Sequence, residues 1–294
     1  MKDLRAIDSA YSPPPVHFVG DGFRVHSFIT PQGPIRSSRM NPFIMLDYNA
    51  PHFFSPSSKL RGVDVHPHRG FETVTIAYQG EISHRDNKGG GGIIGPGDVQ
   101  WMTAASGVLH EECHSESYSK EGGIFQMAQL WVNLPAKHKM SQPKYQPILK
   151  DSIVEVPAGQ KSSVELIAGG YGEFIGPAET FSPLHISNVK LSSNDIVPFS
   201  FPIDWNIGFL LLEGEVVVNG EHELAKDNFA VMDYNAASFE LGAHEGGAKV
   251  LLLAGEPLKE PIVSYGPFVM NTEEEIRQAI TDFQEGVFGD WPQD

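Results

Sequence analysis

The sequence predicts an all-β fold of two tandem barrels, followed by one short helix near the C-terminal end. Short runs of β-branched and apolar residues recur along the chain, and 30 glycines and 22 prolines are scattered between them as turn residues. A pattern of strands and turns in the first half returns in the second half, which indicates duplication of one unit. Hydrophobic residues make up 40% of the chain and charged residues 20%, as in an ordinary globular protein.

The predicted strands fall into two groups. A polar stretch that contains prolines, 137–147, separates them, so we expect one domain over 1–136 and another over 137–294. Asn219-Gly220, between two β-rich runs, is typical of a tight hairpin. The predicted strands are 63–65, 73–78, 99–102, 129–132, 164–167, 185–191, 208–212, 216–218, 229–232 and 248–253.

The repeat is anchored on two similar blocks. Gly80-Glu81 is followed by a polar turn at 96–98, and Gly214-Glu215 is followed by one at 226–228. His66 and His68 precede the first block, but the same offsets before the second block give Ser200 and Pro202. We therefore expect the second barrel to lack the histidine site of the first.

Only residues 272–285 predict a helix. Thr272 and Glu275 have the spacing of a capping box, and Gly286 is a suitable stop. The apolar stripe is expected to pack on a barrel. It consists of Ile276, Ala279, Ile280 and Phe283.

The charge distribution excludes some partners. The formal net charge is −16, and residues 148–294 carry 24 acidic against 7 basic side chains, whereas residues 1–147 are nearly neutral. An acidic half repels phosphate backbones, so direct binding of nucleic acid is not expected. The single cysteine, Cys113, fits a reducing compartment, and no apolar run is long enough to cross a membrane, so a cytoplasmic protein is expected.

The pattern that carries chemistry is His66-Pro67-His68, followed downstream by His110-Glu111-Glu112. In a strand, residues at i and i+2 face the same side, so adjacent strands could close three imidazoles and one carboxylate around a divalent transition metal. On the same predicted strand, Glu72 shares the parity of His66 and His68, so all three are expected to face the same way. Parity alone therefore permits either Glu72 or Glu112 as the carboxylate ligand.

These motifs resemble those of the cupin superfamily, and longer strings resemble the pirin family. The strings are HPHRGFET (66–73), PGDVQWMT (96–103), QLWVNLP (129–135) and GPFVMNT (266–272). The resemblance implies a bicupin, that is, two double-stranded β-helix barrels with a metal in the N-terminal one only. It also implies the ligand set His66, His68, His110 and Glu112, and leaves Glu72 as a neighbour of the site or a spare ligand.

The resemblance implies one bound Fe(II), with Mn, Ni, Co, Cu or Zn as alternatives, because all accept histidine and carboxylate ligands. It further implies a quercetin 2,3-dioxygenase activity on a flavonol-like aromatic substrate and O2, with Glu112 as the general base. The alternative is a metal-containing, redox-sensing regulator that acts on protein partners in transcription or metabolism.

Other residues have weaker signals. His84 and Gln129 are candidates to line or brace the pocket, but ordinary core or surface hydrogen bonding is the favoured interpretation. Cys113 is expected to face away from Glu112. Trp101 and Trp131 lie in predicted strands, where core packing accounts for them.

Overall fold

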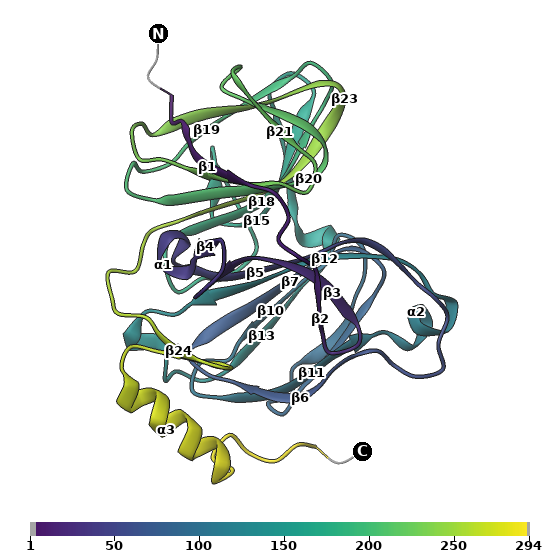
Figure 1. Cartoon of the computed structure of the whole chain (residues 1–294), viewed down its shortest axis with the longest axis vertical. Helices are drawn as coiled ribbons and strands as arrows, with labels where there is room; N and C mark the ends of the chain where they lie inside the picture. Colours follow the sequence, from purple (N-terminus) through teal and green to yellow (C-terminus); the bar gives the residue numbers. More distant parts are fainter. Residues whose placement is uncertain (1–3, 293–294) are drawn as a thin grey trace. The chain divides into compact units, whose positions relative to one another are not determined.

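The computed structural model describes residues 4–292 and consists mostly of β-strands with three short helices, which confirms the predicted all-β class (Figure 1). Contacts divide the chain into two compact units. The first barrel comprises Pro15–Ser38, Pro42–Lys150 and the stretch from Leu258 onward. The second barrel comprises the stretch up to Pro14, Arg39–Asn41 and Asp151–Pro257.

These units differ from the expected division at 136/137 at both ends of the chain. The N-terminal strand β1 (Ile7–Tyr11) pairs with β22 (Phe229–Met232), so it is part of the second barrel. The C-terminal helix is part of the first. The reason is long-range pairing, which the local sequence pattern does not encode.

The first barrel is built from two sheets. The order of the larger sheet is β13-β10-β7-β12-β5-β3-β2, with β4 beside β3, and that of the smaller sheet is β6-β11-β8-β9. The larger sheet contains β2 (His17–Val19), β3 (Phe23–Thr30), β4 (Ile35–Arg36), β5 (Phe43–Phe54), β7 (Phe71–Gln79), β10 (Val99–Thr103), β12 (Gly123–Asn133) and β13 (Lys144–Ile148). The smaller sheet contains β6 (Gly62–His68), β8 (Ile82–Asp86), β9 (Gly91–Ile94) and β11 (Val108–His114). A separate pair is formed by β24 (Val263–Tyr265) and β25 (Phe268–Met270).

The second barrel has one nine-stranded sheet whose interior is apolar. The predicted hairpin at Asn219-Gly220 is confirmed: both residues have positive φ, 56° and 72°, and Glu221 N–H donates to Val218 O at 3.1 Å. Besides β1 and β22, the sheet contains β14 (Val154–Ala158), β15 (Ser162–Ala168), β18 (Leu184–Leu191), β19 (Ile196–Ser200), β20 (Asn206–Val218), β21 (His222–Ala225) and β23 (Ser238–Gly255). A small pair is formed by β16 (Gly170–Tyr171) and β17 (Phe174–Ile175).

The helices are α1 (Ser37–Met40), α2 (Glu116–Glu121) and α3 (Glu273–Gln284). The predicted C-terminal helix is confirmed as α3, with the capping box of Thr272 and Glu275 formed in both directions. Its buried Ile276 and Ala279 pack with Phe268 of β25, as the apolar stripe predicted. Within residues 4–292, no helix has the length and apolarity that a membrane span requires.

One tight turn separates β6 from β7 and fixes which side chains enter the first barrel. Gly70 has φ 90°, and a Cβ on it would lie 2.0 Å from Val269 O, so only glycine fits. Arg69 donates from Nη1 to Asp282 Oδ2 of α3 at 2.7 Å. The buried Lys139 Nζ donates to Gly70 O at 2.7 Å and to Val269 O at 2.9 Å. The turn is therefore held from two sides.

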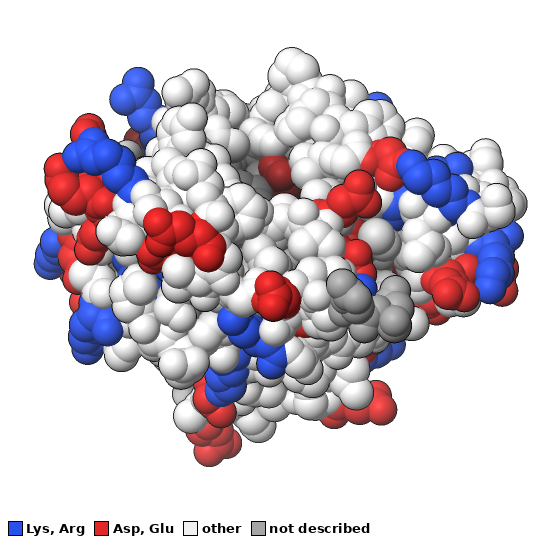
Figure 2. Space-filling model, turned by 90° about the horizontal axis from the view of Figure 1, so that it is seen from below, with Lys and Arg blue, Asp and Glu red and all other residues white. Residues whose placement is uncertain are grey.

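Acidic and basic side chains are mixed on the face of the molecule in Figure 2. No continuous basic patch is visible among the described residues on that face.

Candidate metal centre

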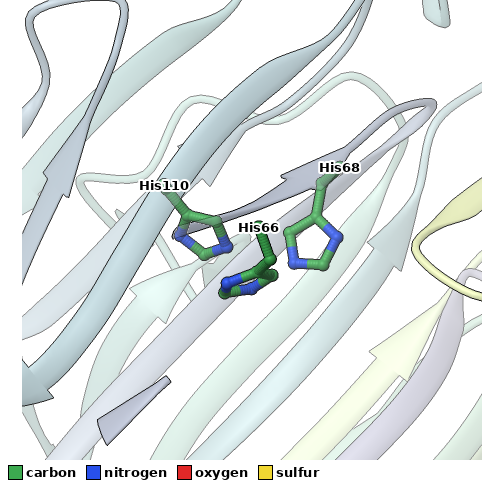
Figure 3. A group of neighbouring side chains, drawn as sticks. All are labelled: His66, His68 and His110. Atoms are coloured by element: carbon green, nitrogen blue, oxygen red, sulfur yellow. The ribbon is translucent and has the colours of Figure 1, made fainter. Parts of the chain in front are cut away.

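Three of the predicted ligands converge inside the first barrel. His66 and His68 project from β6 and His110 from the neighbouring β11, and their rings face one another (Figure 3). One ring nitrogen of each lies within 4.8 Å of one ring nitrogen of the others. His68 and His110 are buried and His66 is half-buried. Such a cluster is the arrangement that a bound divalent metal requires.

The pairing of β6 with β11 contains a bulge next to this cluster. His110 lies opposite His66 and Glu112 opposite Val63, so β6 has one extra residue between these pairs. A bulge shifts the alternation of inward and outward side chains. As a result, Val63 and both histidines of β6 line the same cavity, although Val63 has the opposite parity.

Backbone contacts orient the imidazoles of β6. His66 Nδ1 donates to Asp64 O at 2.8 Å, and His68 Nδ1 donates to Pro267 O at 3.3 Å. These bonds place the proton on Nδ1 and leave the Nε2 lone pair available for a metal. Burial holds the pKa of His68 well below its usual range, and the neighbouring His66 lowers it further. The neutral form is the one that binds a metal.

His110 offers a direct test of whether a metal fits. Its Nε2 is buried and has no hydrogen-bond partner among residues 4–292. An unpaired polar atom in a protein interior is costly unless something binds it. Burial keeps the pKa of His110 well below its usual range, and the neighbouring His68 and His66 lower it further. The imidazole is therefore neutral, and the lone pair of its Nε2 can bind a metal. The donor set therefore fits a divalent transition metal.

Glu112 lines the same cavity as His66 and His68, but it belongs to a second group of close donors with His110 and His84. Its carboxylate accepts hydrogen bonds from Gln129 Nε2 at 2.8 Å and Thr75 Oγ1 at 3.2 Å, and another from Gln100 Nε2. These three donors lie side by side on β12, β7 and β10 of the larger sheet. They hold the carboxylate in one orientation at the edge of the cluster.

His84 stands behind His110. Their Nδ1 atoms are 3.4 Å apart, and His84 Nε2 lies 3.5 Å from Asp86 Oδ2. The His84 ring is stacked on Tyr145 at 5.1 Å between centroids. If Asp86 fixes the proton on His84 Nε2, then His84 Nδ1 accepts the Nδ1 proton of His110. This arrangement again leaves Nε2 of His110 free for a metal.

Replacing His84 by phenylalanine is expected to weaken metal binding by about 10- to 100-fold, because the outer partner of His110 is lost while the ring stacking on Tyr145 is kept. Competition with a chromophoric chelator measures the affinity. His222→Phe, at an exposed position in the second barrel, is the control. Unchanged affinity in His84→Phe would contradict a positioning role.

Glu72 does not join the cluster, which corrects the expectation that it shares a strand face with His66 and His68. The turn at Gly70 ends β6 at His68 and starts β7 at Phe71, so the parity is not continuous. On β7, Thr75 faces Glu112, and Glu72, of opposite parity, accepts a hydrogen bond from Thr103 Oγ1 at 2.7 Å. Glu72 is 1% exposed, and burial raises its pKa from 4.5 to about 7.

This buried carboxyl group gives a prediction about stability. Between pH 4.5 and 7 the folded chain keeps a proton on Glu72 that the unfolded chain loses, so stability falls as the pH rises through this window. Glu72→Gln is expected to raise the free energy of unfolding by up to about 3 kcal/mol at pH 8, and by much less at pH 5. Urea denaturation at both pH values measures it. Loss of bound metal in this variant would instead identify Glu72 as a ligand.

His66 and His68 line a cavity of about 170 Å³, here named the histidine cavity, and His110 lies next to them. The apolar walls of this cavity include Phe23, Val25 and Met127. Asp47 is a second carboxyl group in the lining; it accepts a hydrogen bond from Ser27, and burial raises its pKa. Asp47, Thr75 and Gln100 were not predicted from the sequence. A polar residue at an inward position of an apolar strand was the available signal.

The remaining candidates lie as follows. Gln129 braces Glu112 and lines the cavity. Cys113 is on the opposite face of β11 from Glu112, as predicted, and burial raises the pKa of its thiol to about 11. This thiol is therefore not activated for redox sensing. Trp101 is fully buried, whereas Trp131 is only partly buried and borders the histidine cavity.

Comparisons with known proteins agree with these features. Residues 23–132 match the pirin family, and residues 186–289 match the pirin C-terminal cupin domain. A Pseudomonas aeruginosa protein, provisionally named a quercetin 2,3-dioxygenase, is 46% identical over 92% of this chain and 94% of its own length. Pirin-1 of Arabidopsis thaliana is 34% identical over 90% of this chain and 88% of its own. The crystal structure of quercetin 2,3-dioxygenase from Acinetobacter baumannii has a TM-score of 0.92 and 46% identity, covering 98% of this chain and 99% of that one.

Proposed function

The chain belongs to the pirin family, within the cupin superfamily, and on that basis we propose that it is a metal-dependent dioxygenase that cleaves flavonols such as quercetin. The observation that carries the proposal is the convergence of three imidazoles, two of which line a cavity that also holds a carboxylate. The names of the relatives from Pseudomonas and Acinetobacter support the choice of reaction.

In this proposal the ligands of a single divalent ion, Fe(II) in the first instance, are His66, His68, His110 and Glu112. The backbone contacts of His66 and His68 support their role, because they leave Nε2 of each ring free. When bound, the ion would act as a Lewis acid toward a substrate hydroxyl and would make reaction with O2 accessible.

The residues of the chain have separate tasks. Glu112 takes the proton of the flavonol 3-hydroxyl as general base, and the donors Gln100, Gln129 and Thr75 keep its carboxylate aimed into the cavity. Phe23, Val25 and Met127 provide apolar walls that pack against the ring that carries the 3-hydroxyl group and limit the entry of water. The overall reaction adds O2 to the deprotonated flavonol, opens its heterocycle and releases carbon monoxide.

The test is a comparison of quercetin consumption with and without oxygen. Protein loaded with Fe(II) is expected to consume quercetin and release carbon monoxide in air, and to do neither under anaerobic conditions. Protein stripped of metal by a chelator is the control. Absence of oxygen-dependent quercetin loss in the loaded protein would contradict the proposed activity.

The proposal also places the reaction in the cytoplasm, a reducing compartment. The single cysteine of the chain supports this, because a protein with one cysteine has no internal disulfide to maintain. A small aromatic substrate and O2 are the only reactants that the proposal requires.

A further inference from the structure

A second cavity adjoins the histidine cavity within the first barrel. Its volume is about 490 Å³, against about 170 Å³ for the histidine cavity. Met45 and Trp131 line both cavities. They are directly opposite each other on the paired strands β5 and β12. This cross-strand pair therefore forms a wall that the two cavities share.

The row of side chains along these strands is continuous. One step from Met45 and Trp131 lies the next inward pair, Asp47 and Gln129, which lines the histidine cavity. A ligand that extends along this row from the histidine cluster therefore meets Met45 and Trp131 first and the larger cavity beyond them. Methionine is unbranched and has several rotatable bonds, so it is well suited to a wall that must adapt.

The sizes of the cavities limit what each can hold. Sites for drug-sized ligands measure about 300–1,000 Å³. The histidine cavity, at about 170 Å³, is below this range, and the larger cavity, at about 490 Å³, is within it. The histidine cavity alone is therefore smaller than the sites that usually hold a ligand of the size of a three-ring flavonol.

The larger cavity has the chemistry of a site for a planar aromatic group. Trp131 is stacked on Phe71, with ring centroids 4.2 Å apart, and contacts the His68 ring edge-on at 5.1 Å. Ile262 and Val269 add apolar lining, and Tyr265, 67% exposed, offers an aromatic surface to solvent.

We propose that the larger cavity binds an aromatic ring of the substrate, while the hydroxy-ketone ring of the same molecule occupies the histidine cavity across the Met45–Trp131 wall. The choice of a flavonol as substrate class rests on the proposed function. The cavity assignment itself rests on volume, on the shared wall and on the aromatic and apolar lining. It makes the protein selective for polycyclic hydroxy-ketones over single-ring ones.

The test fills the larger cavity without touching the histidine cluster. Ser264 on β24 and Gln32 in the turn after β3 both line this cavity and are exposed. Ser264→Trp and Gln32→Trp fill it from two separate segments, so a folding defect in one variant does not remove the test. Ser264→Ala is the matched control. Two probes are compared by anaerobic calorimetry on metal-loaded protein: 3-hydroxyflavone, and the single-ring 3-hydroxy-2-methyl-4-pyranone.

The tryptophan variants are expected to bind 3-hydroxyflavone at least about tenfold more weakly, with an unchanged dissociation constant for the pyranone and unchanged metal content. Ser264→Ala is expected to bind both as the parent does. Unchanged affinity for 3-hydroxyflavone in both folded tryptophan variants would overturn the inference, as would equal weakening of both probes. These measurements need no turnover: an inactive parent protein would remove the dioxygenase proposal, but the binding comparison would still decide the role of the cavity.

Discussion

Replacing His68 by alanine is expected to abolish metal binding and quercetin turnover while the protein stays folded. His68 is one of three imidazoles that converge, and it is 4% exposed. The loss in metal affinity should exceed the roughly 100-fold that follows loss of an outer partner, because a direct donor is removed. Loss of the single hydrogen bond from His68 to Pro267 O lowers the free energy of unfolding by only about 1 kcal/mol.

Metal content after dialysis, oxygen uptake with quercetin and thermal unfolding measure the three parts of this prediction. His222→Ala is the control, because His222 is exposed on β21 of the second barrel. A His68→Ala protein that retains metal and turnover would remove the histidine cluster as the site. An unfolded variant would show that His68 has a structural role instead.

Replacing Lys139 by methionine is expected to lower the free energy of unfolding by about 4 kcal/mol. The Lys139 side chain is 1% exposed, and its amine donates to Gly70 O, Asn133 Oδ1 and Val269 O at 2.7, 2.7 and 2.9 Å. Methionine has a similar length but no donor, so three buried acceptors are left unpaired, at about 1–3 kcal/mol each before relaxation. Metal affinity should fall as well, because Gly70 ends the turn that follows His68.

Urea denaturation at pH 6 measures this effect, since burial lowers the pKa of Lys139 to about 7 and the amine is protonated there. Lys137→Met is a matched control, because Lys137 lies two residues away and is exposed. Equal stability of the two variants would contradict the structural role of Lys139.

The fold could be predicted from the sequence to a large extent because its signals are local. The ten predicted runs all lie in strands, and the capping box at Thr272 marks the helix correctly. The long strand β5 and its neighbour β3 were missed, since their mixed polar and apolar residues follow no simple alternation. The membership of β1 and α3 in the two barrels was also missed, because it depends on pairing over more than 200 residues.

The histidines of the site were predictable because side chains at i and i+2 point to the same face in any regular strand. Glu72 was misplaced because the spacing argument assumed an unbroken strand, and the positive φ of Gly70 breaks it. The donors to Glu112 were not predictable as a set. They come from three strands that become neighbours only when the sheet forms, and no local pattern links Thr75 to Gln100 or Gln129.

The segment from Leu258 onward belongs to the barrel that carries the histidines, and Asp282 and Val269 both contact the turn behind His68. A gene fragment that stops near the midpoint of the chain would therefore encode the first barrel without the C-terminal segment that contacts the turn behind His68. A shorter protein that contains only the first barrel would need the segment from Leu258 onward. A designed linker in place of residues 151–257 would connect that segment to Lys150. Each barrel is built from segments that are separated in the sequence, so neither barrel can be obtained by truncating the chain at one position.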